Sequence, residues 1–277
     1  MVLWLYGVNF VLGLLVLLPA YSTLRREMGS SLEYLKVLSG FDFTVYSDFR
    51  QAHGAAVDPL LTVGFGLGLL YALLTVFFSG GILVQLTDAG DHRQTFRLSR
   101  FLAASVHGFG RFFRLALCVC GFCLLLAFFF LLAGGLGGLS LSDHLNEEGL
   151  SYFALICLAV FSLAVLVVLC VGDYARILLF RRDETRAFPV FWEAMRFVFS
   201  HSQAAFGNYL LLLGVGLGCL GGYFLLESWI VTSGWAEIGL LFLVQQFFIF
   251  ARIFLKSWTL ATAMTVVAGQ EKQPIIS

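Results

Sequence analysis

The side chains best suited to chemistry in this sequence are two cations inside an apolar stretch near the C-terminus. Arg252 and Lys256 stand four residues apart, so on an α-helix they share one face. Gln245, one heptad earlier, and Thr259 extend that face into a polar stripe. Charged groups are costly inside a bilayer and often mark functional sites there. Two interpretations stay open: the long side chains reach out to the lipid headgroups, or the stripe lines a polar cavity.

Asp173 is the acidic residue expected to balance this stripe. It lies at the inner end of the fourth apolar stretch, and a folded bundle would bring it to the same end as Arg252 and Lys256. An unpaired charge near the middle of a bilayer costs roughly 2.5–3.5 kcal/mol on insertion scales, so pairing or contact with headgroups is expected. In the cavity interpretation these residues form a cytoplasm-facing site for an anionic headgroup or solute.

Other reactive constellations are weak. The five histidines all lie in connections, and the strings H-E-x-x-H and G-x-S-x-G do not occur. The six cysteines lie inside apolar stretches, where reduced thiols behave as small apolar side chains. The sequence therefore predicts no catalytic residue, no metal site and no cofactor, and it disfavours an enzyme.

Glycine spacing is the clearest packing signal. Gly214, Gly218 and Gly222 occur at every fourth position, and Gly64 and Gly68 repeat that spacing once. Such a strip clears one helix face and lets a second backbone approach closely. We expect these glycines to pack inside the bundle, with an interface to another chain as the alternative.

All these side chains must be positioned by elements that suit the composition. Of the 277 residues, 60% are apolar and only 12% are charged, whereas soluble domains carry about 25% charged residues. The 17 basic residues balance the 17 acidic ones, which leaves no net charge to attract a nucleic acid. A soluble enzyme and a nucleic-acid binder are excluded, and an all-α polytopic protein of the lipid bilayer is predicted.

Six apolar stretches reach the length of about 20 residues that a spanning helix needs. Their apolar runs are continuous and do not alternate, which indicates helices and not barrel strands. We expect one membrane domain over residues 1–277. The predicted spans are 2–20, 60–86, 113–139, 151–172, 208–226 and 238–260.

The distribution of arginine predicts the orientation. The connections 87–114 and 173–207 hold ten arginines, so the positive-inside rule places both in the cytoplasm, with both termini inside. Arg25 and Arg26, directly after the first span, are the contrary signal. The expected location is the inner (cytoplasmic) membrane.

Two segments, 95–108 and 189–203, are predicted as amphipathic elbow helices along the cytoplasmic interface. Each has an apolar stripe opposite polar residues. The stripe residues are Phe101, Ala104 and Val106 in the first elbow and Phe191, Met195 and Val198 in the second.

The outer connection, residues 21–58, is predicted to hold two short helices, 31–38 and 44–52. Its aromatic side chains, among them Phe41 and Phe43, need apolar surface to pack on. A small cap over the outer end of the bundle is expected, and an element that docks a partner is the alternative.

A repeat relates spans three and four to spans five and six. Residues 109–112 (FGRF) open the third span and 206–209 (FGNY) the fifth, while the triplet ARI occurs at 175–177 and 251–253. The layout of six spans with basic elbows resembles bacterial integral membrane families, such as the membrane domain fused to glycerophosphodiester phosphodiesterases. The resemblance covers most of the chain in layout, but only the elbow and FG segments in residues, and it transfers no functional residue.

Two functions fit these observations. The first, favoured by the 30 phenylalanines and few intramembrane charges, is a non-catalytic subunit or scaffold that packs against other membrane-protein chains. The alternative is a small permease or lipid-handling protein that uses the polar stripe.

Overall fold

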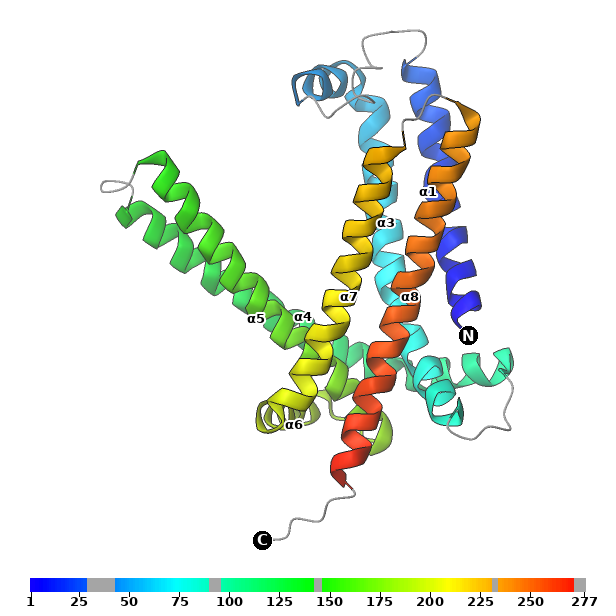
Figure 1. Ribbon diagram of the computed structural model, residues 1–277, viewed down its shortest axis with the longest axis vertical. Coiled ribbons are helices and arrows are strands. Elements are labelled where there is room, and N and C mark those ends of the chain that lie inside the picture. Colours follow the sequence, from blue (N-terminus) through cyan, green and yellow to red (C-terminus); the bar gives the residue numbers. More distant parts are fainter. Residues whose placement is uncertain (29–42, 90–95, 142–145, 231–233, 272–277) are drawn as a thin grey trace. The chain divides into compact units, whose positions relative to one another are not determined.

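The computed structural model describes residues 1–28, 43–89, 96–141, 146–230 and 234–271 (Figure 1). The described residues form the helices α1 (Val2–Met28), α3 (Phe43–Ala89), α4 (Leu98–Leu141), α5 (Glu147–Arg181), α6 (Ala187–Ser200), α7 (Ser202–Trp229) and α8 (Trp235–Glu271). All of these except α6 contain a stretch long and apolar enough to cross a membrane. The predicted all-α, six-span polytopic fold is confirmed.

Each predicted span lies inside a longer helix, because hydropathy marks only the apolar part and the helical hydrogen bonds continue into the polar flanks. The start of α5 shows how such a helix begins. The side chain of Asn146 accepts a hydrogen bond from the backbone N–H of Gly149 at 3.0 Å. Glu147 and Glu148 then fill the first turn, where negative charge suits the helix dipole.

The chain has two compact units, Met1–Thr75 and Val76–Ser277, whose boundary falls inside α3, and the single membrane domain over residues 1–277 stays a prediction. The first holds α1 and the greater part of α3, and the second holds the end of α3 and all later helices. The dividing point comes shortly before Gly80 and Gly81, where α3 packs closely on α4. The candidate chemistry lies in the second unit.

In the predicted outer connection, residues 21–28 belong to α1 and residues 43–58 belong to α3. Residues 29–42, with the predicted helix 31–38, lie outside the described residues. Residues 44–52 are helical as predicted, but they belong to α3, which runs on through Gly54 and Pro59. Pro59 lacks an N–H and so removes one helical hydrogen bond without ending the helix. Phe43, expected to pack beneath a cap, is 71% exposed.

In the second unit, small residues bring the end of α3 against α4. A Cβ added to Gly80 would lie 2.7 Å from the carbonyl oxygen of Ala104, and one on Gly81 would lie 2.6 Å from the ring of Phe101. Such distances leave no room for a side chain, so these glycines allow the two backbones to approach. The sequence rule of every fourth glycine had not selected this adjacent pair.

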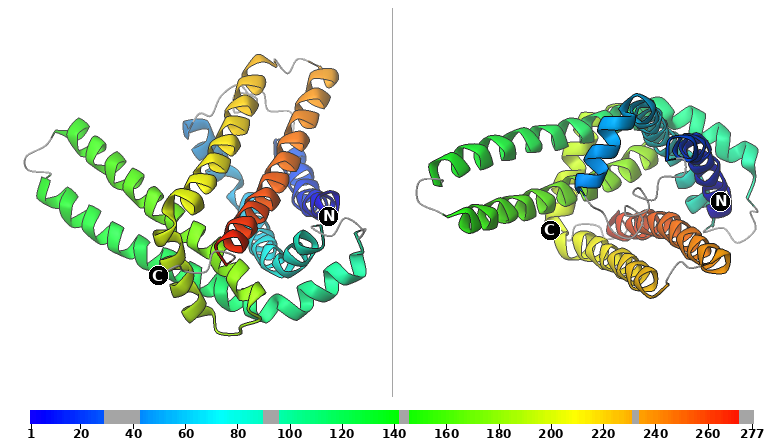
Figure 2. Two further views of the ribbon diagram at one scale, coloured as in Figure 1. Left: turned by 60° about the horizontal axis from the view of Figure 1, so that its bottom comes forward. Right: turned by 90° about the horizontal axis from the view of Figure 1, so that it is seen from above.

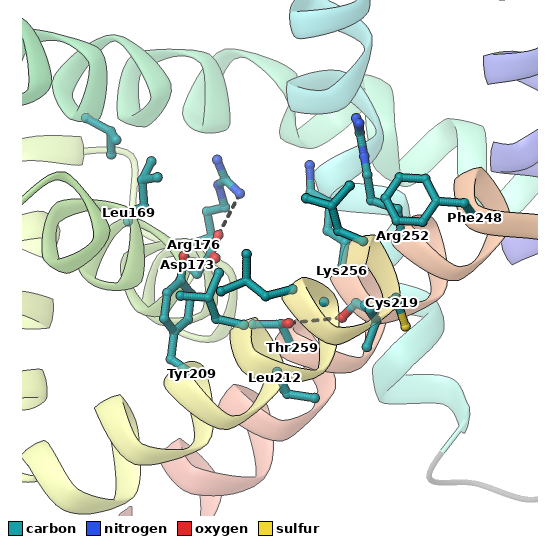
Figure 3. A pocket seen from close by; sticks show the side chains of 17 residues that line it. Leu169, Asp173, Arg176, Tyr209, Leu212, Cys219, Phe248, Arg252, Lys256 and Thr259 are labelled. Atoms are coloured by element: carbon teal, nitrogen blue, oxygen red, sulfur yellow. Dashed lines mark hydrogen bonds and ion pairs between the residues drawn. The ribbon is translucent and has the colours of Figure 1, made fainter. Parts of the chain in front are cut away.

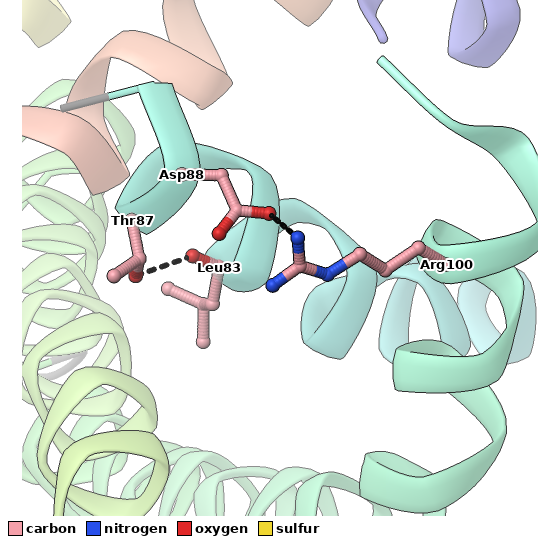
Figure 4. Close-up of polar contacts among 4 residues, drawn as sticks. All are labelled: Leu83, Thr87, Asp88 and Arg100. Atoms are coloured by element: carbon pink, nitrogen blue, oxygen red, sulfur yellow. Dashed lines mark hydrogen bonds and ion pairs between the residues drawn. The ribbon is translucent and has the colours of Figure 1, made fainter. Parts of the chain in front are cut away.

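An ion pair joins the same two helices at their polar ends (Figure 4). The carboxylate of Asp88 in α3 lies 3.1 Å from the guanidinium of Arg100 in α4. Thr87 donates its hydroxyl to the carbonyl of Leu83 at 2.9 Å, within α3. Since the Arg100 side chain is half-exposed, the pair contributes at most about 1 kcal/mol to stability. The close glycine contact is therefore the main determinant of this packing.

The first predicted elbow is not a separate helix. Residues 98–108 form the first turns of α4, which continues without interruption into the third span. Its buried face includes Phe101, Ser105, Gly108 and Phe112. Of the predicted stripe, Phe101 is buried inside the unit, whereas Val106 is 66% exposed. The contact with the glycines of α3, and not hydropathy alone, decides which face is buried.

The second predicted elbow is a separate helix, α6. Val190, Phe191, Ala194 and Val198 are buried, and the ring of Phe191 stacks on that of Phe122 with centroids 4.7 Å apart. Phe191 and Val198 belong to the predicted stripe. A second side of α6 carries exposed aromatic residues, namely Phe188, Trp192 and Phe199. This helix therefore packs on the bundle with one face and presents aromatic rings outward with another.

The four long helices of the second unit form two antiparallel hairpins, α4 with α5 and α7 with α8, as the sequence repeat predicts (Figures 1 and 2). The hairpins converge at their basic ends, near α6, and diverge toward their acidic ends (Figure 1). Contacts of α5 with both α6 and α8 join them.

Candidate functional site

A pocket of about 480 Å³ lies where α5, α7 and α8 meet (Figure 3). Val119 of α4 closes one side. Much of the wall is apolar, with contributions from Leu169, Leu212, Leu213, Leu217, Leu220, Phe248 and Leu255. The polar part of the wall is formed by the side chains that the sequence analysis considered for chemistry.

Charged side chains reach this pocket from two helices. Asp173 and Arg176 come from α5, and the Asp173 carboxylate lies 2.8 Å from the Arg176 guanidinium. Arg252 and Lys256 come from α8, and their charged ends point into the space that Arg176 also faces (Figure 3). Within the described part of the chain, the lining thus holds three positively charged side chains and one negatively charged one, a formal net charge of +2.

The packing of α5 explains why its two charges face the pocket. Tyr174, Ala175 and Ile177 are buried in the core that α6 completes. The Tyr174 hydroxyl donates to the carbonyl of Ala205 at 3.5 Å, which links α5 to the start of α7. With those positions occupied, Asp173 and Arg176 lie on the remaining side of the helix, with 22% and 20% of their side chains exposed.

Gly172 determines how closely α5 approaches α4 beside the pocket. A Cβ added there would lie 3.0 Å from a methyl carbon of Val119. A larger residue would require the Val119 side chain to give way by a few tenths of an ångström beside Asp173. The glycine therefore positions the charged pair, although it carries no chemistry itself.

The polar residues of the pocket lie at similar distances along their helices, measured from the acidic ends. Lys256 stands about 20 residues after the start of α8, and Tyr209 about 20 residues before the end of α7. Asp173 follows the first turn of α5 by about 25 residues. Roughly 17–25 helical residues cross the hydrocarbon of a bilayer. Measured from the acidic ends, all three residues therefore reach the opposite boundary of the membrane.

The structure divides the predicted polar stripe. Arg252, Lys256 and Thr259 line the pocket together with Asp173. Gln245 does not line it. Its amide donates to the hydroxyl of Tyr223 at 3.3 Å. The heptad spacing keeps Gln245 on the same side of α8, but seven residues displace it by about 10 Å along the helix. Gln245 therefore lies on the predicted face of α8 but outside the pocket.

Two pocket residues were not singled out from the sequence. Arg176 is the ion-pair partner of Asp173, and Tyr209 contributes its ring from α7. The signal for Arg176 was present, because it occupies the same place in the ARI triplet as Arg252. What the sequence could not show is that the two related arginines face the same cavity.

The glycines predicted to pack lie at open positions of their own units. For Gly214, Gly218 and Gly222, an added Cβ would meet no atom within 4 Å in the described part of the chain. The glycine that faces α8 is Gly216, whose added Cβ would lie 3.8 Å from Leu255. Gly64 and Gly68, in the first unit, are likewise open within the described residues. Inside their own units these glycines make no close contact with described residues, and their role in packing within the bundle stays a prediction. Contact with another chain stays a prediction.

A smaller cavity of about 160 Å³ lies between the end of α3, the start of α4 and the end of α5. Arg111 and Asp183 line it and form an ion pair, and His107 lies beside them. Asp183 has a φ of 53°, a left-handed conformation that Asp tolerates better than most residues. The hydrogen bond from Arg111 holds the pKa of the Asp183 carboxyl below its usual range. This pair connects α4 to the segment that follows α5.

The two cavities correspond through the repeat. When the ARI triplets are aligned, the lining positions 179, 180 and 183 of the small cavity match 255, 256 and 259 of the large one. Phe180 then occupies the place of Lys256. The excess positive charge therefore belongs to the α5–α7–α8 pocket and is not a general property of the hairpins.

No family model, curated protein or solved structure matches this chain. Among the residues that the structure describes, no three His, Cys, Asp or Glu side chains gather as metal ligands would. The functional argument therefore rests on the geometry and charge of the pocket.

Proposed function

We propose that this polytopic membrane protein handles lipids and binds an anionic headgroup of the cytoplasmic leaflet in the α5–α7–α8 pocket. The observation that carries the proposal is the cluster of Arg176, Arg252 and Lys256 around one cavity, with Asp173 as the only carboxylate among the described residues of its wall. Cations that face each other near hydrocarbon are unfavourable unless an anion or water compensates them. A bound headgroup would supply that compensation through charge-assisted hydrogen bonds.

The position of the cluster favours a lipid over a solute that crosses the membrane. Asp173, Tyr209 and Lys256 reach the membrane boundary at the basic ends of their helices, which is where headgroups lie. Under the positive-inside rule this boundary is the cytoplasmic one, and both termini lie inside. Toward the bilayer centre the wall turns apolar, with Leu217, Leu220 and Phe248 available for the first methylenes of an acyl chain.

Native mass spectrometry of the full chain, after gentle extraction, tests this proposal. The test variant is R252Q/K256Q, which removes both α8 charges and keeps the side chains polar. The matched control is R97Q/R186Q, which removes two exposed arginines outside the pocket. Charge-assisted hydrogen bonds contribute about 1.5–3 kcal/mol each, so we expect retention of phospholipid to fall at least tenfold in the test variant.

The control variant should retain lipid as the wild type does. If both double variants lose lipid equally, the retained molecules are surface lipids and the pocket is not their site. If the wild type retains no anionic lipid, the proposal is wrong.

A non-catalytic subunit or scaffold is the second candidate, and one observation favours it. A Cβ added to Gly214, Gly218 or Gly222 would meet no described atom of its own unit within 4 Å, so a helix of another chain could approach this strip. Gly218→Leu should then release a co-purified chain, whereas Gly121→Leu, at an open glycine of α4, should not. If the wild type extracts as a lone chain, this candidate loses its support.

A further inference from the structure

The class of headgroup follows from the charge of the pocket, an inference that rests on the proposed function. We infer that the pocket binds a lipid phosphomonoester, a terminal phosphate of the phosphatidic acid type, in preference to a phosphodiester. Arg176, Arg252 and Lys256 against Asp173 leave two net positive charges in the lining. A phosphomonoester carries about −1.5 to −2 near neutral pH and matches this charge. A phosphodiester carries one negative charge, about one fewer than the net positive charge of the lining.

The directions of the donors support the same ligand. Arg176 is held by Asp173 at 2.8 Å on the α5 side, while Arg252 and Lys256 approach from α8 (Figure 3). A terminal phosphate presents three strong acceptor oxygens, so groups on both sides can each reach one. A diester has one acceptor fewer and a second ester arm, which must leave the pocket between the same donors. The arrangement of cations on two walls therefore suits a terminal phosphate.

The smaller cavity between α3, α4 and α5 lacks, among its described residues, the charge that a phosphomonoester would need. At the position equivalent to Lys256 it has Phe180, and its Arg111 is paired with Asp183. That cavity has the same place in the repeat but lacks the excess charge. We therefore confine the inference to the α5–α7–α8 pocket.

The test compares two lipids that differ by one methyl group. The full-length protein is placed in phosphatidylcholine nanodiscs that contain either dioleoylphosphatidic acid or dioleoylphosphatidylmethanol, its methyl ester, at equal mole fraction. The acyl chains are identical, and esterification removes one ionisable oxygen. We expect the wild type to retain the phosphomonoester about tenfold more, the effect of one charge-assisted hydrogen bond.

Variants of Lys256 connect this preference to the pocket. K256Q should reduce the preference to about twofold or less, since one positive charge and its donors are lost. K256R keeps the charge and should keep the preference, which separates the role of charge from a folding defect. The exposed control R97Q should also keep it.

The possible outcomes are distinguishable. If both lipids are retained equally and both are lost in R252Q/K256Q, the phosphomonoester inference is overturned while the proposed function stands. If neither lipid is retained by the wild type, both fail. Glycerol 3-phosphate provides the soluble form of the same headgroup: displacement of the lipid at equal concentration would overturn the assignment to a lipid.

Discussion

Replacing Gly80 by alanine tests the packing that unites α3 with α4. The added Cβ would lie 2.7 Å from the carbonyl oxygen of Ala104 and 3.3 Å from the ring of Phe112. The ring can rotate, but the carbonyl belongs to the backbone of α4. The two helices must therefore separate, and G80A should destabilise the second unit.

The size of the effect follows from two opposing terms. Overpacking of a tight contact costs typically about 1–3 kcal/mol. Alanine also favours a helix over glycine by up to about 1 kcal/mol. G214A gains the same helix propensity, but its Cβ would meet no described atom within 4 Å. The propensity term cancels between the variants, so G80A should be about 1–3 kcal/mol less stable than G214A.

Thermal denaturation in a mild detergent, monitored by tryptophan fluorescence, measures this difference. At about 2–4 °C per kcal/mol, the Tm of G80A should lie several degrees below that of G214A. Equal Tm values for the two variants would refute the assigned contact between α3 and α4. A loss of stability in G214A alone would show that the α7 strip is the packed surface, as the scaffold function requires.

Three further predictions concern single side chains. D173N removes the carboxylate that the described residues place in the pocket wall. It should tighten retention of phosphatidic acid by up to about fivefold, measured by native mass spectrometry, since a repulsion of up to about 1 kcal/mol disappears. Arg111 holds the pKa of Asp183 below its usual range, so the stability from this pair is present above about pH 4 and is lost as the pH falls through the lowered pKa. The difference in Tm between wild type and D183N should therefore shrink in strongly acid solution, and a constant difference would contradict the ion pair. Trp192, on the exposed aromatic side of α6, should be quenched more by lipids brominated near the glycerol than at the chain ends, in a variant where it is the sole tryptophan.

The features that depend on one helix could be predicted from the sequence. Arg252 and Lys256 share a face because four residues make about one helical turn, and they line the same pocket. The separate helix α6 follows from its apolar stripe and from Pro189 in its first turn. Both predictions needed only local periodicity and the length of a span.

The features that depend on how a helix is rotated toward its neighbours could not be predicted from the sequence. The pairing of Arg176 with Asp173 at the pocket requires Tyr174 and Ile177 to be buried on the other side of α5, which tertiary contacts decide. Glycine spacing did not select Gly80 and Gly81, which lack the four-residue repeat and yet pack closely on α4. The continuity of α4 through the first elbow was missed because a polar segment with glycines need not end a helix.

The most direct test of the lipid-phosphate site is the distance between Lys256 and a lipid phosphorus. The chain has three lysines, so K36R/K272R leaves Lys256 as the only lysine for ¹⁵N labelling. Solid-state NMR of this variant, in vesicles of phosphatidylcholine with phosphatidic acid, then reports the dipolar coupling from Nζ to ³¹P. We predict a coupling that corresponds to about 4 Å, the separation across a charge-assisted hydrogen bond to a phosphate oxygen, and its loss when R252Q/R176Q are added. No measurable coupling in the presence of phosphatidic acid would contradict a lipid phosphate in this pocket.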